Sequence, residues 1–214
     1  MQFSHLHNHS QFSLLDGASK ISSMFKKAKE DNMPAVAITD HGNMFGVFQF
    51  VAEAGKHGVK PIVGCEFYLV TDRHKQVFTK ELKDKRYHQL FLAKNPEGYQ
   101  NLIKLCSLGF MEGMYSKYPR IDKELVLKYH KGLIATTCCL GASVPQAILR
   151  SGEDEAEKEF KWWLDLFGED YYVEVQNHHI PEQQVVNEVL LRFAKKYNVK
   201  VIASNDSHYL DQKD

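Results

Sequence analysis

The sequence predicts an α/β fold in which seven strands alternate with helices and close into a barrel. Strand-like and amphipathic segments alternate along the whole chain, which is typical of βα units joined by right-handed crossovers. Several strand-like segments are apolar almost throughout, as expected for a parallel sheet that is covered on both faces. No G-x-G-x-x-G motif follows the first strand. With seven units, this absence favours a closed barrel over a doubly wound open sheet.

The expected strands are short and mostly apolar, and they cover residues 4–9, 35–40, 60–69, 88–94, 132–138, 171–176 and 199–206. The expected helices have apolar residues at helical spacing, and they cover residues 19–31, 45–57, 96–111, 122–130, 153–167 and 181–197. Residues 71–87 are dense in charges of both signs, which predicts a solvated surface loop, although its cations also suit contact with a phosphate backbone. Residues 113–122 are expected to form a turn-rich connector, and no internal domain boundary is expected.

Composition excludes several classes of protein. The 214 residues include 27 Lys and Arg against 27 Asp and Glu, so no global field draws in a polyanion and a DNA-coating protein is not expected. The N-terminus does not resemble a secretory signal, and no apolar run is long enough to span a bilayer. The four cysteines contain no C-x-x-C pair. Together these features predict a cytoplasmic protein without a membrane partner.

The eleven histidines are numerous for a neutral protein, and the first of them form a pattern. His7 and His9 share one face of the first expected strand, where both can reach one metal ion, and His5 lies on the same face as a further candidate. An isolated H-x-H is also common as a plain surface pair. Asp16 follows in a turn, where it is either a ligand or a cap.

Other expected strands end in the same kind of residue. Because Asp40 and His41 are neighbours, only one can face the barrel axis on regular geometry, so we assign His41 to a metal and Asp40 to the orientation of an imidazole. Glu66 lies in an apolar strand, where a buried carboxylate needs a cation. In the last strand, Asp206 and His208 repeat the spacing of two.

A barrel brings these strand ends to one rim, so the sequence predicts a metal site there. Mixed histidine and carboxylate ligands suit Zn, Mn or Fe rather than Ca. More than four candidate ligands exceed what one tetrahedral zinc ion can use, which predicts at least two ions. Paired metal ions are a common device for phosphoester hydrolysis, with in-line attack of an activated water on phosphorus.

The segments HLHNHS, TDHGN, GCE and NDSH resemble the four motifs of the polymerase and histidinol phosphatase (PHP) family. The resemblance is closest to the PHP domains that open the alpha subunits of bacterial DNA polymerase III, through QFSLLDGA, PAVAITDHGNMFG, CLGASVPQ and ASNDSHY. It implies a distorted seven-stranded (β/α)7 barrel with two or three divalent metal ions, with zinc as the preferred metal and manganese or iron as alternatives. The implied metal ligands are His7, His9, Asp16, His41, Glu66, His88, Cys139, Asp206 and His208.

Two of these positions depend on local structure. His88 begins its expected strand, so it reaches the site only if residues 67–70 and 88–94 form a hairpin, and otherwise it is a rim histidine. The family pattern selects Cys139 rather than Cys138 as the thiolate. Strand alternation places these two cysteines on opposite faces, which predicts that only one reaches the metals.

The resemblance implies a metal-dependent phosphoesterase that acts as a 3′–5′ proofreading exonuclease on a primer end. Asp206, His208 and Asp40 are the expected catalytic residues, with Arg120 as a phosphate clamp and His178 at the mouth of the site. Two alternatives stay open: a small-molecule phosphatase of the histidinol-phosphatase type, and a metal-stabilised structural module.

We expect residues 1–214 to be the N-terminal PHP domain of a larger polymerase subunit, because the chain stops soon after the last strand. DNA synthesis would belong to the rest of that subunit, since this chain has no room for a polymerase palm. The expected partners are primer DNA, the remaining domains of the alpha subunit and other replisome subunits.

Overall fold

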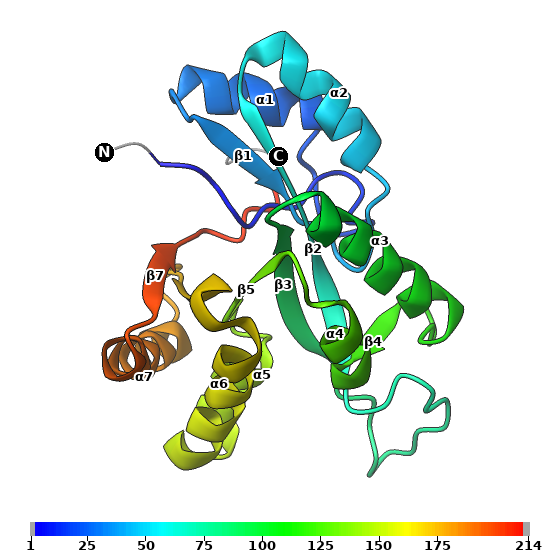
Figure 1. The fold of residues 1–214 in the computed structure, drawn as a ribbon, viewed down its shortest axis with the longest axis vertical. Helices are drawn as coiled ribbons and strands as arrows, with labels where there is room; N and C mark the ends of the chain where they lie inside the picture. Colours follow the sequence, from blue (N-terminus) through cyan, green and yellow to red (C-terminus); the bar gives the residue numbers. More distant parts are fainter. Residues whose placement is uncertain (1–2, 212–214) are drawn as a thin grey trace.

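The computed structural model describes residues 3–211 and contains a curled, mixed sheet with helices packed around its outer side (Figure 1). The sheet order is β1-β2-β3-β5-β6-β7, and β4 pairs with β2. The strands are β1 (Ala35–Ile38), β2 (Lys60–Val70), β3 (Tyr87–Ala93), β4 (Arg120–Asp122), β5 (Leu133–Thr136), β6 (Tyr171–Val175) and β7 (Lys200–Ala203). The predicted α/β barrel class is confirmed, and its strands are shorter and less regular than expected.

Within the described residues, seven α-helices flank the sheet (Figure 1). They are α1 (Ile21–Glu30), α2 (Val47–His57), α3 (Pro96–Met111), α4 (Lys123–Tyr129), α5 (Ser143–Arg150), α6 (Glu153–Phe167) and α7 (Pro181–Tyr197). Helices α1 and α2 lie beside β1 at one end, whereas α5, α6 and α7 lie beside β5 to β7 at the other. Local sequence starts the helices: Asn95 caps α3 by accepting a hydrogen bond from the Gly98 amide, and Pro96 follows it.

Strand β3 runs against both of its neighbours, while the other strand pairs of the sheet are parallel. Tyr68 of β2 faces His88 of β3 in an antiparallel register. The local hairpin on which the position of His88 depended is therefore present. It turns the start of β3 toward the same end of the barrel as the ends of the parallel strands.

The segment predicted as the first strand, residues 4–9, is not a regular strand. It lies between β1 and the segment after β7, and two backbone hydrogen bonds join it to each. On the β1 side, Ala37 N donates to His5 O and Thr39 N to Asn8 O, both at 2.9 Å; on the other side, His9 N donates to Ser207 O at 2.8 Å and Ser207 N to His7 O at 3.2 Å. Side chains replace part of the missing ladder, because Thr39 Oγ1 donates to Asn8 O and accepts from Asn8 N, each at 2.9 Å. This irregular segment closes the sheet in place of a strand.

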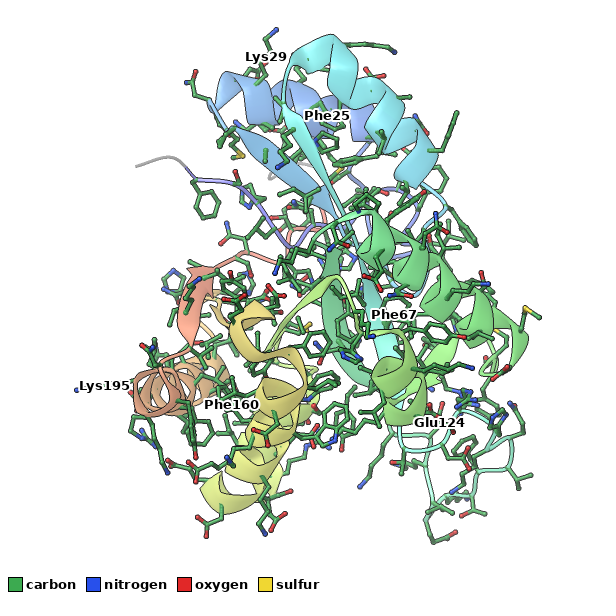
Figure 2. The ribbon with its side chains drawn as sticks, in the orientation of Figure 1. Phe25, Lys29, Phe67, Glu124, Phe160 and Lys195 are labelled. Carbon is green, nitrogen blue, oxygen red and sulfur yellow. The ribbon has the colours of Figure 1, made fainter. Side chains whose placement is uncertain are left out.

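The core has one layer inside the curled sheet and larger layers outside it. Along β3, Leu90 and Leu92 belong to the inner cluster, whereas Phe91 belongs to the outer one, as strand alternation requires. Figure 2 shows Phe67 and Phe160 among the packed layers, and both are buried. The labelled charged residues of Figure 2 lie on the exterior: Lys29, Glu124 and Lys195.

Two elements were not expected. Strand β4 lies within the predicted connector at 113–122; it has only three residues, so periodicity could not reveal it. Helix α5 has eight residues and carries Pro145 in its first turn, where the missing amide hydrogen costs no intrahelical bond. Both are short segments that tertiary pairing stabilises.

The charged loop predicted at 71–87 is anchored to the barrel and is not fully solvated. Arg73 is 6% exposed, and its guanidinium contacts Asp122 at 2.9 Å and Glu112 at 2.8 Å. The cations of this loop therefore have different roles: Arg73 is buried and anchors the loop, whereas Lys80 and Lys83 are exposed at the surface.

Within residues 3–211, no helix is long and apolar enough to cross a membrane, and the four cysteines are free thiols. The expectation of a truncated barrel rested partly on residues 212–214, which lie outside the described residues.

Candidate metal centre

The side chains that the sequence predicted as metal ligands lie together at one end of the barrel. They come from the closing segment and its turn, the turn after β1, the β2–β3 hairpin, and the turns after β5 and β7. The converging residues are His7, His9, Asp16, His41, Glu66, His88, Cys139, Asp206 and His208. His5 stands apart, with its ring packed edge-on against Phe3.

Glu66 is the centre of this cluster and is fully buried. Its Oε1 lies 3.4 Å from His7 Nε2 and 3.0 Å from His88 Nδ1. Its Oε2 lies 3.3 Å from His9 Nε2 and 2.7 Å from His41 Nδ1. Because the two oxygens face different histidines, the carboxylate is suited to bridge two cations.

His7 and His9 form the deepest part of the cluster, and both are 0% exposed. Asp206 faces them from the segment after β7, with its Oδ1 3.2 Å from His7 Nε2 and 3.1 Å from His9 Nε2. Asp206 has a left-handed backbone, φ 48°, which ends the extended run of the chain and turns its carboxylate inward.

A second, more accessible part of the cluster is formed by Asp16, His41 and His208. His41 Nε2 lies 2.8 Å from Asp16 Oδ2 and 3.4 Å from His208 Nε2. The Asp16 side chain is 55% exposed and that of His208 is 24% exposed. This side of the cluster is therefore the one that a solute can reach.

His88 and the adjacent cysteines form the third part. Cys139 Sγ lies 3.4 Å from His88 Nδ1 and 3.4 Å from Glu66 Oε1. The expectation that only one cysteine reaches the cluster is wrong, because Cys138 Sγ lies 3.2 Å from the same Glu66 oxygen. Strand β5 has already ended, and Cys138 has a left-handed backbone, φ 56°, so strand alternation no longer applies.

Hydrogen bonds on the far side of the imidazoles fix which ring nitrogen faces the cluster. His7 Nδ1–H donates to the buried Glu174 carboxylate at 2.8 Å, which leaves the Nε2 lone pair toward Glu66 and Asp206. His208 Nδ1–H donates to the Asp206 carbonyl oxygen at 2.8 Å. Such outer partners orient metal-binding histidines. Sequence reasoning missed Glu174, although it lies in an apolar strand, as Glu66 does.

Asp40 supports the cluster from outside and does not face it. Its carboxylate accepts hydrogen bonds from Ser10 N at 2.6 Å and from Ser13 Oγ at 2.8 Å. Ser13 Oγ in turn accepts from His9 Nδ1–H at 2.9 Å. Asp40 therefore orients an imidazole, as expected, but through Ser13, and its assignment as a catalytic residue is corrected to a positioning residue.

The charges of the cluster are strongly coupled. Burial lowers the pKa of His9, but the Asp206 and Glu66 carboxylates outweigh burial and raise it to about 9. Burial likewise opposes charge on Glu66, yet His88, His7 and His41 hold its pKa well below the ordinary value. Ionised carboxylates are thus concentrated at the place where several histidine nitrogens meet, which favours a cation there.

The donor atoms fit metal ions by a second criterion. Five buried side-chain atoms of the cluster have no hydrogen-bond partner among the described residues: His7 Nε2, His9 Nε2, His41 Nδ1, Glu66 Oε2 and Asp206 Oδ1. Buried polar atoms are rarely left unpaired in a folded protein, because each costs about 1–3 kcal/mol. Cations bound among these atoms would supply partners that the protein does not.

Two predicted substrate contacts are not at the site. Arg120 is fully buried, and its guanidinium donates to Asp84 at 3.1 Å and to the carbonyl oxygens of Arg73 and Lys75. The phosphate clamp expected there is wrong, because Arg120 braces the loop at 71–86. His178 uses Nε2 for the Asn205 carbonyl, 2.8 Å, and Nδ1 for Gln183, 3.0 Å, so no ring nitrogen is left for a substrate.

A cavity of about 520 Å³ opens beside Asp16, His41 and His88. Its wall also contains the aromatic and basic residues Tyr68, Tyr87, Tyr118, Lys85, Arg86 and Arg150. A larger and more apolar cavity, about 830 Å³, lies among residues at the opposite ends of the parallel strands, such as Pro61 and Ile62. None of the converging residues lines it, so the chemistry belongs to the smaller cavity.

The sequence is similar to a known protein family and to subunits of bacterial DNA polymerases. The profile of the PHP domain matches residues 5–178. DNA polymerase III subunit alpha of Borreliella burgdorferi is 45% identical over 213 residues, and those of Thermus aquaticus and Aquifex aeolicus are 46% and 48% identical over 217 and 218 residues. These matches cover 99–100% of this chain but only 18–19% of each relative, so the chain spans less than a fifth of their length.

Solved structures share the fold at low sequence identity. A protein of Bifidobacterium adolescentis, provisionally described as a metal-dependent phosphoesterase, matches with a TM-score of 0.59 and 16% identity, over 97% of this chain and 88% of its own. An amidohydrolase of Chromobacterium violaceum with bound sulfate matches with a TM-score of 0.61 and 15% identity, over 96% and 87%. These likenesses concern the fold alone.

Proposed function

Because this chain belongs to the PHP domain family, we propose that it binds two or three divalent metal ions and uses them to hydrolyse phosphoester bonds. The observation that carries the proposal is the set of buried, unpaired donor atoms around Glu66. In this cluster, buried imidazole nitrogens and carboxylate oxygens converge without forming regular hydrogen bonds, and bound cations would supply the partners that they lack. Zinc is the first candidate, with manganese or iron as alternatives, because the donors are imidazole, carboxylate and thiol.

The donor atoms divide into three neighbouring groups. His7, His9, Glu66 and Asp206 would hold one ion; His41 and His208, with Asp16, a second; and His88, Glu66 and Cys139 a third. Bound divalent ions supply charge neutralisation for phosphoryl oxygens and acidify a coordinated water. The chain's own part is to keep the deep ligands dry and to present the accessible side, Asp16 and His208, to the substrate.

For the substrate we propose the 3′ end of a primer strand, so that the domain acts as a 3′–5′ proofreading exonuclease. The relatives are replicative polymerase subunits, which supports a place beside primer DNA, the remaining domains of an alpha subunit and other replisome subunits, in the cytoplasm. We further propose that residues 1–214 form one domain of such a subunit, with DNA synthesis performed elsewhere in it.

A structural role for the metals is the main competing function. The accessible side of the cluster argues against it: a metal that only stabilises the fold needs no open cavity, yet Asp16 and His88 line one of about 520 Å³. A small-molecule phosphatase also uses such a cavity, so substrate preference must separate it from an exonuclease.

The test compares hydrolysis of a 3′-mismatched primer with hydrolysis of a small phosphomonoester by the metal-loaded chain. We expect preference for the primer, and a loss of at least about 100-fold in the Asp206→Ala, His208→Ala variant, since two ligands are removed. His130→Ala, a substitution of a half-buried histidine outside the cluster, is the control. Preference for the phosphomonoester would favour the small-molecule phosphatase, and undiminished activity in the double variant would exclude the site.

A further inference from the structure

The cavity beside the metal cluster continues into a second cavity of about 430 Å³. The two share four lining residues, Lys85, Tyr87, Gln146 and Arg150, so they adjoin at a waist between the end of the charged loop and helix α5. Beyond the waist, the second cavity runs past Thr71 and Ser151, away from the metal ligands. A groove therefore leads from the cluster across this face of the domain.

The charged residues along the groove differ in whether they form ion pairs within the chain. Most are neutralised inside the chain: Arg86 pairs with Asp84, Lys123 pairs with Glu159 at 2.7 Å, and Glu155 pairs with Lys158 at 2.5 Å. The two cations of the waist differ. Among the described residues, no ion pair or side-chain hydrogen bond engages Lys85 or Arg150, and no acidic residue lines the waist with them.

Aromatic rings lie on the cluster side of these cations. The Arg86 guanidinium stacks over the Tyr118 ring at 3.8 Å, and Tyr68 packs edge-on against Tyr118 with ring centroids 5.0 Å apart. Tyr87 adds a further ring at the waist itself. Unpaired cations interleaved with aromatic faces are the means by which proteins hold single-stranded nucleic acids, with phosphates on the cations and bases on the rings.

We propose that this groove is the path of a single polynucleotide strand, with Lys85 and Arg150 clamping the next phosphate on the 5′ side of the scissile one. Each cavity falls within the range of about 300–1,000 Å³ that accepts a drug-sized ligand, so each has room for one nucleotide. A compact phosphomonoester would occupy the first cavity and leave the second cavity, beyond the waist, unused. The proposal rests on the proposed function of the metal site, and it adds the path of the strand and the residues that recognise it.

The test measures binding separately from hydrolysis. A short fluorescein-labelled oligothymidylate is titrated with the metal-loaded chain at several salt concentrations, followed by fluorescence anisotropy. The variant Lys85→Gln, Arg150→Gln is expected to weaken binding about tenfold. It should also lower the slope of log K against log salt by about 1.4, since each lost phosphate contact on a single strand contributes about 0.7.

The matched control is Lys80→Gln, Lys83→Gln, which makes the same charge change on the same loop at residues that line neither cavity. It should lower the slope little, while Lys85→Arg, Arg150→Lys should retain tight binding. Hydrolysis of a small chromogenic phosphodiester should be equal in wild type and in the Lys80→Gln, Lys83→Gln variant. Equal slopes in the two glutamine variants would overturn the strand path.

Failure of the proposed function has a different signature. If the oligonucleotide binds with the expected salt dependence but neither substrate is hydrolysed, the groove stands and the phosphoesterase proposal falls. If the small diester is hydrolysed and the waist variant binds oligonucleotide as wild type does, the phosphoesterase stands and the groove falls.

Discussion

Glu174 shows how one buried residue supports the cluster without belonging to it. It accepts the Nδ1–H of His7 at 2.8 Å and is held in turn by Thr136 Oγ1 at 2.6 Å and by the Ser204 hydroxyl. Burial alone would raise its pKa, but His7 and these hydroxyls lower it, so Glu174 is a carboxylate. Its charge and position keep the Nε2 of His7 free for coordination.

The substitution Glu174→Gln should therefore weaken metal binding by about 10–100-fold, the usual effect of losing an outer partner of a metal-bound histidine. Competition with a chromophoric chelator measures the affinity. Glu169→Gln, which changes an exposed carboxylate in the turn just before β6, serves as the control and should not alter the metal affinity. Equal affinities in wild type and Glu174→Gln would show that His7 is not a ligand.

The thiol of Cys106 lies away from the proposed metal ligands, and its reactivity should report how deeply it is buried. Burial raises its pKa to about 11 from an ordinary value of 9.0, so the thiolate is scarcer than in an exposed cysteine. At pH 8, alkylation by iodoacetamide should be about 100-fold slower in the folded chain than in the urea-unfolded chain, because only the thiolate reacts. Peptide mass mapping follows the rate at this residue. A folded-state rate that levels off near pH 9 would contradict the burial.

At the residue scale, the sequence alone supported the histidine and carboxylate candidates through spacing, while His88 and Cys139 came from the family resemblance. Glu174 was missed and Cys138 was wrongly ruled out for a physical reason. The contacts of Glu174 with His7 and of Cys138 with Glu66 cross the barrel, and no local sequence pattern predicts such contacts. Arg120 was misassigned because the local sequence does not distinguish an arginine that binds a phosphate from one that is buried and donates to three carbonyl groups.

At the element scale, the loop at 71–86 depends on the brace formed by Arg120. The guanidinium donates to the carbonyl oxygens of Gly113, Arg73 and Lys75 and to Asp84, all while fully buried. Removing such a donor leaves several acceptors unpaired in the interior. The brace also fixes the end of the loop that brings Lys85 and Arg86 to the cavity.

Arg120→Leu should lower the free energy of unfolding by about 3 kcal/mol, because buried acceptors lose their donor. Urea unfolding measures this change, with Lys117→Leu, which lies nearby at the surface, as the comparison. A residue that only clamps a substrate would behave in the opposite way: its loss would raise KM and leave the unfolding free energy unchanged.

Long, strongly patterned elements were predictable, and the elements that shape the site were less so. Helix α7 and strand β2 match their expected ranges closely, since apolar periodicity decides them. Residues 4–9 were expected as a strand because they alternate, but the backbone is irregular where Asn8 and Thr39 side chains take over the pairing. The strands after which the ligands lie end early, at Thr136 and Ala203, because Cys138 and Asp206 turn the chain.

At the scale of the whole molecule, the zero net charge has a different meaning from the one composition suggested. Charges are paired over most of the groove, and uncompensated positive charge is confined to the waist beside the cluster. A domain of this kind does not coat DNA, but it can hold one strand at one place. Local arrangement, not total charge, therefore carries the nucleic-acid proposal.

The barrel as a whole serves to gather distant segments around Glu66. The closing segment, the β2–β3 hairpin and the turns after β5 and β7 are far apart in the sequence, and each supplies donors to the same buried volume. Because the donors come from both halves of the chain, metal binding should require the folded barrel. The central claim is thus a multinuclear centre built by the fold.

The most direct test is the metal content of the freshly purified chain, measured by inductively coupled plasma mass spectrometry without added metal. The account predicts two or three divalent ions per chain, with zinc the most abundant, and a lower content in Asp206→Ala, His208→Ala. A content of one ion or none, unchanged after incubation with zinc, manganese or iron, would contradict it.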